Sequence, residues 1–253
     1  MVSLSTIFHR SGSSRFFFQG SVAWIRWLYV AGILLLVVGM IWGLFFAPAD
    51  RLQGESARIM FVHVPAAHLS QLVYLAIAAA GVVWLVWRMK LVDICMTALA
   101  PIGCALTGLA LASGAIWGIP TWGTGWVWDA RLTSTLVLFF LYIGLIALRG
   151  ALAGNQRAAM AVSILALVGA VNIRIIKYSV DWFATLHQPG SITLGGPPAM
   201  APAFLWPLAV NVLGFHALVA GAALAAMRAE LVQRDARTDW VRSVLNVGPK
   251  QAP

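Results

Sequence analysis

The chain has 253 residues, of which 61% are hydrophobic and only 10% are charged, and its mean hydropathy is +0.86. This composition excludes a soluble domain, because a soluble fold could not cover so much apolar surface. The formal net charge of +9 could indicate a nucleic-acid partner, but the basic residues flank hydrophobic runs instead of forming a solvated patch. We interpret them as signals of membrane topology, with no nucleic acid bound.

Apolar runs long enough to cross about 30 Å of hydrocarbon recur along the whole chain. Six such runs predict an all-α integral membrane protein, a bundle of six helices in membrane lipid that forms a single domain over residues 1–253. The fifth run is the least apolar, because Asn172 and Arg174 interrupt its end and an ionisable residue within a span is costly. The predicted helices cover residues 22–46, 59–87, 94–116, 132–148, 158–176 and 204–227.

Lysine and arginine are distributed unevenly between the two sides that six spans define. Twelve of them flank the side that carries both termini, and five flank the other side. Because basic residues accumulate on the cytoplasmic side of membrane proteins, both termini are expected in the cytoplasm. The segments predicted on the opposite side are residues 47–58, 117–131 and 177–203.

The second of these segments is rich in tryptophan. It reads WGIPTWGTGWVWD from Trp117 to Asp129 and holds four of the chain's 12 tryptophans, interleaved with glycine and Pro120. Glycine and proline argue against a continuous helix and favour a loop over residues 117–131. Tryptophans at a membrane surface can be simple interfacial anchors. Four rings in one loop, however, also form a platform for a flat ligand.

Haem has the shape and charge that such a platform would suit, since it is flat and carries two carboxylates at one edge. Arg131 follows the loop directly, and Arg58 precedes the second predicted helix on the same side. Either guanidinium could pair with a haem propionate. Alternatively, each arginine could simply extend from a helix end to the membrane surface.

Imidazole is the usual axial ligand of haem iron, and the chain has five histidines. His63 lies near the start of the second predicted helix and His187 lies in the third segment, so topology brings both to the side of the tryptophan loop. His68 and His216 lie deeper within predicted spans, and His9 lies in the cytoplasmic tail. His68 is about 140° around the helix from His63, so these two cannot share one ligand face. A structural role for His63 and for His187 stays open.

A longer run around the loop is familiar from known proteins. The residues WGTGWVWDARLT, from Trp122 to Thr133, resemble the WWD signature, WGxxWxWD, of the haem-handling membrane proteins that include CcmC, CcmF and CcsA. The order of further short runs, and six spans in 253 residues, make the chain most similar to the CcmC family, haem exporter protein C of bacterial cytochrome c maturation. These runs are FAPAD, HVPAA, APIG and TLHQ, which begin at Phe46, His63, Ala100 and Thr185.

The resemblance implies a haem-binding and transfer protein of the bacterial inner membrane, not an enzyme. Such proteins hold haem b at the periplasmic face and load it onto the haem chaperone CcmE, together with the small membrane protein CcmD. Association with the CcmA and CcmB ATPase proteins would also fit. The resemblance places the two axial ligands of the iron at His63 and His187. It assigns further haem contacts to Trp122, Gly123, Trp126, Trp128 and Asp129, and to Trp117, Gly118 and Arg131 beside them.

Three residues near this site differ from the others, because one has an expected structural role and two depart from the family pattern. Asp129 is expected to fix the loop or to cap the fourth predicted helix, because a carboxylate is favourable at a helix N-terminus. Arg174 and Lys177 depart from the family pattern, which has proline and histidine at the corresponding positions. The departure makes the local backbone of the fifth helix hard to predict.

Two other functions stay open at this point. A redox protein that passes electrons between quinone and haem would need a pair of histidines on facing helices within the bilayer, and His68 and His216 are the candidates. A transporter subunit that moves haem across the membrane is the other alternative. No inverted repeat of the kind common in transporters is visible in the sequence.

Overall fold

The computed structural model describes residues 13–153, 157–192 and 196–245. Within these ranges six helices are long and apolar enough to cross a membrane, and the predicted all-α membrane fold is therefore confirmed. The elements are α2 (Ser14–Ile41), the π-helical turn η1 (Trp42–Phe46), the 3₁₀ turn η2 (Glu55–Ile59), α3 (Met60–Trp87), α4 (Lys90–Trp122), α5 (Ala130–Ala151), α6 (Arg157–Trp182), α7 (Pro202–Arg234) and α8 (Asp239–Val244).

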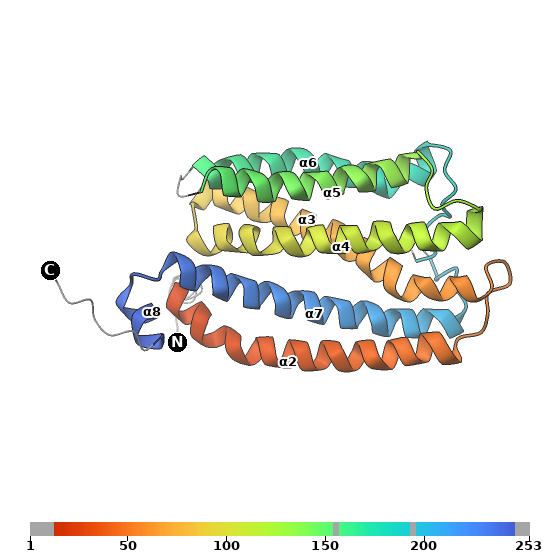
Figure 1. Ribbon diagram of the computed structural model, residues 1–253, viewed down its shortest axis with the longest axis horizontal. Helices are drawn as coiled ribbons and strands as arrows, with labels where there is room; N and C mark the ends of the chain where they lie inside the picture. Colours follow the sequence, from red (N-terminus) through yellow and green to blue (C-terminus); the bar gives the residue numbers. More distant parts are fainter. Residues whose placement is uncertain (1–12, 154–156, 193–195, 246–253) are drawn as a thin grey trace.

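The six long helices form three pairs, and the helix axes lie roughly along the long axis of the molecule (Figure 1). The pair α2 and α7 lies on one side of the bundle, the pair α5 and α6 lies on the other, and α3 and α4 lie between them. Helix α3 crosses the bundle obliquely, so that it packs against both α7 and α6. The central pair therefore joins the two outer pairs.

The two ends of the bundle carry different connections (Figure 1). At one end lie the connections from α2 to α3, from α4 to α5 and from α6 to α7, and we call this the loop end. At the opposite end lie α8 and the connections from α3 to α4 and from α5 to α6, and we call this the α8 end. The three segments predicted on one side of the membrane thus meet at the loop end.

Glycines allow α2 and α7 to pack closely along their length. A Cβ atom added at Gly32 would lie 2.7 Å from Cδ2 of Leu218, and one added at Gly214 would lie 2.9 Å from Cδ2 of Leu36. Small residues at a membrane helix interface permit such an approach, and the close contacts then supply van der Waals attraction. The pair α2 and α7 is therefore held by shape complementarity.

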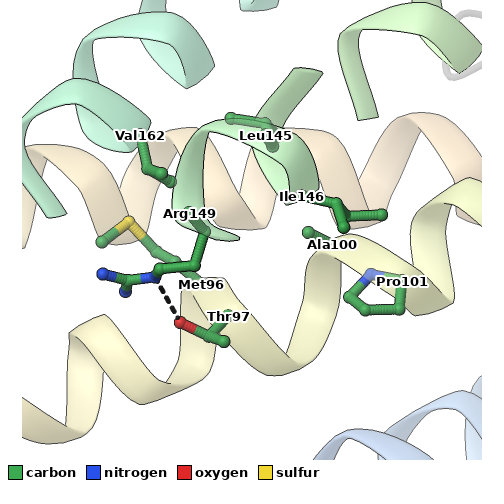
Figure 2. Close-up of a pocket in the computed structure, with 8 residues that line it drawn as sticks. All are labelled: Met96, Thr97, Ala100, Pro101, Leu145, Ile146, Arg149 and Val162. Carbon is green, nitrogen blue, oxygen red and sulfur yellow. Dashed lines mark hydrogen bonds between the residues drawn. The ribbon is translucent and has the colours of Figure 1, made fainter. Parts of the chain in front are cut away.

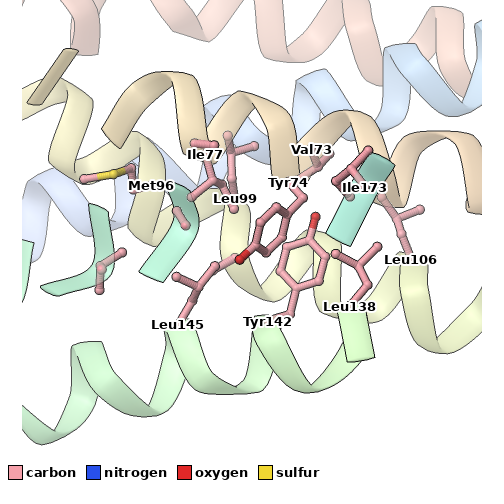
Figure 3. Packing of buried hydrophobic residues seen from close by; sticks show 14 of the residues in the cluster. Val73, Tyr74, Ile77, Met96, Leu99, Leu106, Leu138, Tyr142, Leu145 and Ile173 are labelled. Atoms are coloured by element: carbon pink, nitrogen blue, oxygen red, sulfur yellow. The ribbon is translucent and has the colours of Figure 1, made fainter. Parts of the chain in front are cut away.

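Two tyrosines form the centre of the core between α3, α4, α5 and α6 (Figure 3). The rings of Tyr74 and Tyr142 are fully buried and meet edge to face, with 5.1 Å between their centroids. The Tyr142 hydroxyl donates a hydrogen bond of 2.7 Å to the carbonyl of Ser70. A Cβ atom at Gly103 would overlap the Tyr142 ring. Each phenol is thus satisfied without water, as a membrane interior requires.

Ion pairs hold the α8 end together. The carboxylate of Asp93 on α4 accepts from Arg149 on α5 and from Arg234 on α7, and Lys90 pairs with Asp235. Because Asp93 is buried and both of its oxygens have partners, its charge is compensated where water is scarce. This network fixes α4, α5 and α7 relative to one another.

The helices extend beyond the predicted apolar runs, and at one point this corrects the prediction. Helix α4 continues to Trp122, so the predicted loop over residues 117–131 is shorter, and Trp117, Gly118 and Trp122 are helical. Pro120 lies within the last turns of α4, so one backbone hydrogen bond of the helix is missing there. Gly123 ends the helix with a left-handed φ of 76° while its N–H donates 3.0 Å to the Ile119 carbonyl.

Candidate binding site at the loop end

The short loop that links α4 to α5 ends at Asp129, which caps α5. One carboxylate oxygen of Asp129 accepts a 2.7 Å hydrogen bond from the backbone N–H of Leu132. The predicted cap is therefore confirmed, and it satisfies one of the free N–H groups of the first helical turn. Gly118 lies opposite the returning chain, since a Cβ atom there would be 2.7 Å from the Thr124 carbonyl oxygen. The loop thus folds back over the end of α4.

The second oxygen of Asp129 holds His187, which comes from the connection between α6 and α7. The Nδ1 atom of His187 lies 3.1 Å from Asp129 Oδ2, and Thr185 donates a hydrogen bond to the same oxygen. The Thr185 hydroxyl in turn accepts from the backbone N–H of His187 at 3.1 Å. Because a carboxylate only accepts, Nδ1 carries the proton and the lone pair of Nε2 is free for another partner.

The pKa values of this pair favour a neutral imidazole beside a charged carboxylate. Burial raises the pKa of the Asp129 carboxyl, but hydrogen bonds from Thr185, the Leu132 backbone and His187 outweigh it, so this pKa lies below its usual value. Burial lowers the pKa of His187 below 6.5, although the hydrogen bond and charge of Asp129 oppose that effect. At neutral pH His187 is therefore uncharged and able to donate an electron pair.

His63 is oriented in a similar way by α4. Its Nδ1 atom lies 3.1 Å from the hydroxyl of Ser113, and that hydroxyl donates its own proton to the Leu109 carbonyl at 2.6 Å. Ser113 must therefore accept the Nδ1 proton of His63, which leaves Nε2 as the free lone pair. Gly114 makes room for the ring, because a Cβ atom there would be 2.9 Å from Cε1 of His63.

Tryptophan rings lie against both histidines. The Trp117 ring meets His63 edge to face with centroids 5.6 Å apart, and its indole N–H donates 3.0 Å to Gln53. The Trp122 ring lies 4.8 Å from the His187 ring, also edge to face. The tryptophan-rich segment is therefore divided, because its first two rings are fixed on α4 beside the imidazoles.

The last two tryptophans of the segment lie in the loop itself. Trp126 and Trp128 meet edge to face at 5.3 Å. The indole nitrogen of Trp126 is buried without a hydrogen-bond partner among the described residues, whereas the Trp128 side chain is 76% exposed. A buried donor without an acceptor is costly. The loop thus contains a buried indole N–H, that of Trp126, without a hydrogen-bond partner among the described residues. It also contains a large apolar side chain, Trp128, that is mostly exposed.

The two candidate arginines have different surroundings. Arg131, at the start of α5, donates a 3.0 Å hydrogen bond to Ser179 on α6 and lies close enough to His187 for its charge to act on it. Arg58 on η2 pairs with Glu55 and donates to carbonyls of η1, including Gly43 at 3.2 Å. The structure therefore brings Arg131 to the His187 side of the site, while Arg58 is engaged in holding η2 to η1.

The two imidazoles could each offer an Nε2 lone pair to the iron of a haem. Among the described residues no cluster of three or more His, Cys, Asp or Glu side chains could hold a bare metal ion. Within the same part of the chain, neither Nε2 atom of His63 and His187 has a hydrogen-bond partner. Haem provides four ligands from its own ring and needs only axial ones, so the donor set fits haem.

Several residues of the site were not found from the sequence. Ser113, Gln53 and Ser179 hold His63, Trp117 and Arg131 respectively, although each lies far from its partner along the chain. Serine and glutamine in or beside an apolar span give no pattern that identifies a ligand-orienting role. Thr185, in contrast, stands two residues before His187, and this spacing is typical of a local side-chain to backbone turn.

The other sequence candidates lie elsewhere. His68 on α3 and His216 on α7 come together, with 5.4 Å between ring centroids, and His9 lies outside the described residues. A cavity of about 100 Å³ beside Arg149 (Figure 2) is mainly apolar and contains none of the predicted site residues. It is lined by Met96, Thr97, Ala100, Pro101, Leu145, Ile146, Arg149 and Val162.

Fold and site together define a multi-pass membrane protein with two preoriented histidines beside a tryptophan-rich loop. The family model described as "Heme exporter protein C" (CcmC) matches residues 7–242. The chain belongs to this family, and the resemblance drawn from its WWD run is confirmed.

Curated relatives agree with the family assignment. The chain is 47% identical to heme exporter protein C of Escherichia coli (strain K12) over 221 residues, which are 87% of this chain and 89% of the relative. It is 48% identical to the protein of the same name from Haemophilus influenzae, over 84% of this chain and 86% of the relative. For the Bradyrhizobium diazoefficiens protein the identity is also 48%, over 85% and 81%.

Proposed function

We propose that the chain binds haem b at the loop end and passes it to another protein during cytochrome c maturation. Relatives that share almost half of its residues are named heme exporter proteins, which supports a role in haem handling. The observation that carries the proposal is the pair of imidazoles, each with Nδ1 bonded to the protein and Nε2 free. His63 and His187 would ligate the iron, one from each side of the porphyrin.

The tryptophans and Arg131 would hold the porphyrin itself. Indole rings beside the imidazoles offer apolar surface to a flat macrocycle, and the unpartnered N–H of Trp126 would donate to one of its carboxylates. Arg131 would add a charge-assisted contact to a propionate. Haem supplies the redox-active iron, whereas the residues of this chain bind and orient it.

A site at one end of the bundle, with Trp128 largely exposed, suits transfer to a partner that approaches from outside the membrane. We therefore propose CcmE as the acceptor, with CcmD, CcmA and CcmB as further components of the assembly. The loop end would face the periplasm and both termini the cytoplasm of a bacterial inner membrane, as the distribution of basic residues indicates. In this role the chain would present haem without itself being an enzyme.

The proposal is tested by the haem content of the purified protein. The wild type, the His63→Ala/His187→Ala variant and a His9→Ala control would be purified in mild detergent and analysed by absorption and the pyridine haemochrome assay. We expect haem with the wild type and the control, and at least a tenfold lower content or a changed iron spectrum in the double variant, because axial ligation is lost.

Two results would contradict the proposal. A double variant with full haem content and an unchanged spectrum would show that these histidines are not the ligands. A wild-type protein that contains no haem and takes none up when haem is supplied would exclude haem binding by the isolated chain.

A further inference from the structure

A second group of basic side chains lies where α3 packs against α6 and α7. The His68 and His216 rings are 5.4 Å apart and tilted by 39°, and the His68 side chain is exposed. The Nδ1 atom of His216 lies 2.7 Å from the carbonyl of Val212 on its own helix. The Nδ1 proton of His216 is thus engaged, while His68 keeps a ring N–H to offer to a ligand.

Lys177 on α6 adds a positive charge to this pair. It is exposed, and it lies close enough to His68 for its charge to act on the ring. Arg174 stands one turn away on α6 and is also exposed, so the two cations are neighbours on the helix surface. Asp181 stands one turn further towards the loop end and lies close enough to Arg131 for its charge to act on it. Within the described residues, the observed ion pairs include neither Lys177 nor Arg174.

The depth of the group in the membrane follows from helix geometry. Lys177 stands twenty positions after Arg157 on α6, and His68 stands twenty positions before Arg88 at the end of α3. At 1.5 Å per residue each separation is about 30 Å, which equals the thickness of the hydrocarbon layer. If the arginines of the α8 end mark one boundary of that layer, Lys177 and His68 lie near the opposite boundary, where phosphate groups are found.

An unpaired cation at the edge of the hydrocarbon layer is costly, and anionic lipid head groups attract basic residues there. A metal cation does not suit the histidine pair, since Lys177 would repel the ion. We propose that His68 and Lys177 bind the phosphate head group of an anionic phospholipid, with the His216 ring packed against His68.

The experiment compares lipid retention by the intact protein. Wild type and variants would be exchanged into detergent with equal amounts of dioleoyl phosphatidylglycerol and dioleoyl phosphatidylcholine, and bound lipid would be counted by native mass spectrometry during stepwise delipidation. Wild type should retain the anionic lipid preferentially. The His68→Leu/Lys177→Gln variant should lose that preference by about fivefold or more, because a basic residue near the membrane surface contributes about that factor.

Matched variants make the result specific. Lys177→Arg should restore the preference in the presence of His68, and Arg51→Gln, which removes an exposed cation at the same end of the bundle, should leave it intact. A wild type without preference, or a double variant that keeps it, would overturn the proposal. Haem content measured on the same samples should not change. A parallel loss of haem would assign the group to haem instead of lipid and would also overturn the proposal.

Discussion

The loop end and the α8 end of the bundle both carry polar side chains in apolar surroundings, but only one of them leaves binding capacity unused. At the α8 end the Asp93 carboxylate has an arginine for each oxygen. At the loop end two imidazole Nε2 atoms and the indole N–H of Trp126 have no partner within the described residues. Polar groups that satisfy each other stabilise a fold, whereas preoriented groups without partners indicate a ligand.

The sharpest test of this comparison is Asp93→Asn, which should affect stability and not haem binding. The variant leaves the guanidinium groups of Arg149 and Arg234 without their shared charge in a mostly buried position. Breaking such a buried pair costs about 3 kcal/mol. The midpoint of thermal unfolding should fall clearly, while haem bound per folded protein stays at the wild-type level. A loss of haem from folded Asp93→Asn protein would show that the two ends are not independent.

The opposite result is expected for Asp129→Asn. Asparagine still caps a helix, so the stability of α5 should change little, but the carboxylate that orients His187 is lost. Removing such a supporting partner typically lowers metal affinity by about 10- to 100-fold. Haem titration of the apoprotein measures the affinity, and Asp129→Ala serves as the comparison that should lower stability as well. Wild-type affinity in Asp129→Asn would mean that this hydrogen bond does not prepare a ligand.

A smaller effect is expected from Trp128→Ala. Because the side chain is 76% exposed, its removal should change the free energy of unfolding by no more than about 0.5 kcal/mol. Loss of one aromatic contact with the porphyrin should weaken haem binding by roughly threefold to tenfold. Trp24→Phe, on the exposed surface of α2, is the control. Unchanged haem affinity would indicate that Trp128 is an interfacial anchor.

The pH dependence of haem binding should report on His187. Its pKa lies below 6.5, so affinity should be constant above that pH and should fall as the pH drops through this pKa, because protonation removes the lone pair that binds iron. The Asp129 carboxylate raises the pKa of His187. Asp129→Asn should therefore move the fall to still lower pH, and a shift in the other direction would contradict the assigned contact.

The membrane fold could be predicted from sequence because hydrophobic length is a direct physical requirement of the bilayer. All six spans were found, although α2, α6 and α7 also extend beyond the predicted bounds, and the end of α4 is the error that changes the site. Gly118 and Pro120 indicated a loop, but Pro120 lies within the last turns of the helix and Gly123 is the residue whose φ ends it. Composition thus located the break only to within a few residues, since glycine and proline favour a helix end without fixing the residue at which it falls.

The candidate site could be predicted only in part. His63, His187 and the tryptophans were predicted as candidates, and topology correctly placed them at one end of the bundle. The partners that orient the histidines could not be predicted, because Ser113 lies fifty residues from His63 and such pairings depend on how helices pack. The contact between the His68 and His216 rings could likewise not be predicted, since it depends on the oblique path of α3 across α7.

The two oxygens of Asp129 have different partners. One accepts from the backbone at the start of α5, and the other accepts from the ring N–H of His187 and from Thr185. A substitution that removes both oxygens, such as Asp129→Ala, would therefore weaken haem binding and also fray the start of a membrane helix. Thr185 contacts the same oxygen without taking part in the cap. A family member that needed faster release of haem could therefore change Thr185 without affecting the cap of α5. Position 129, in contrast, would have to keep a side chain that caps this helix.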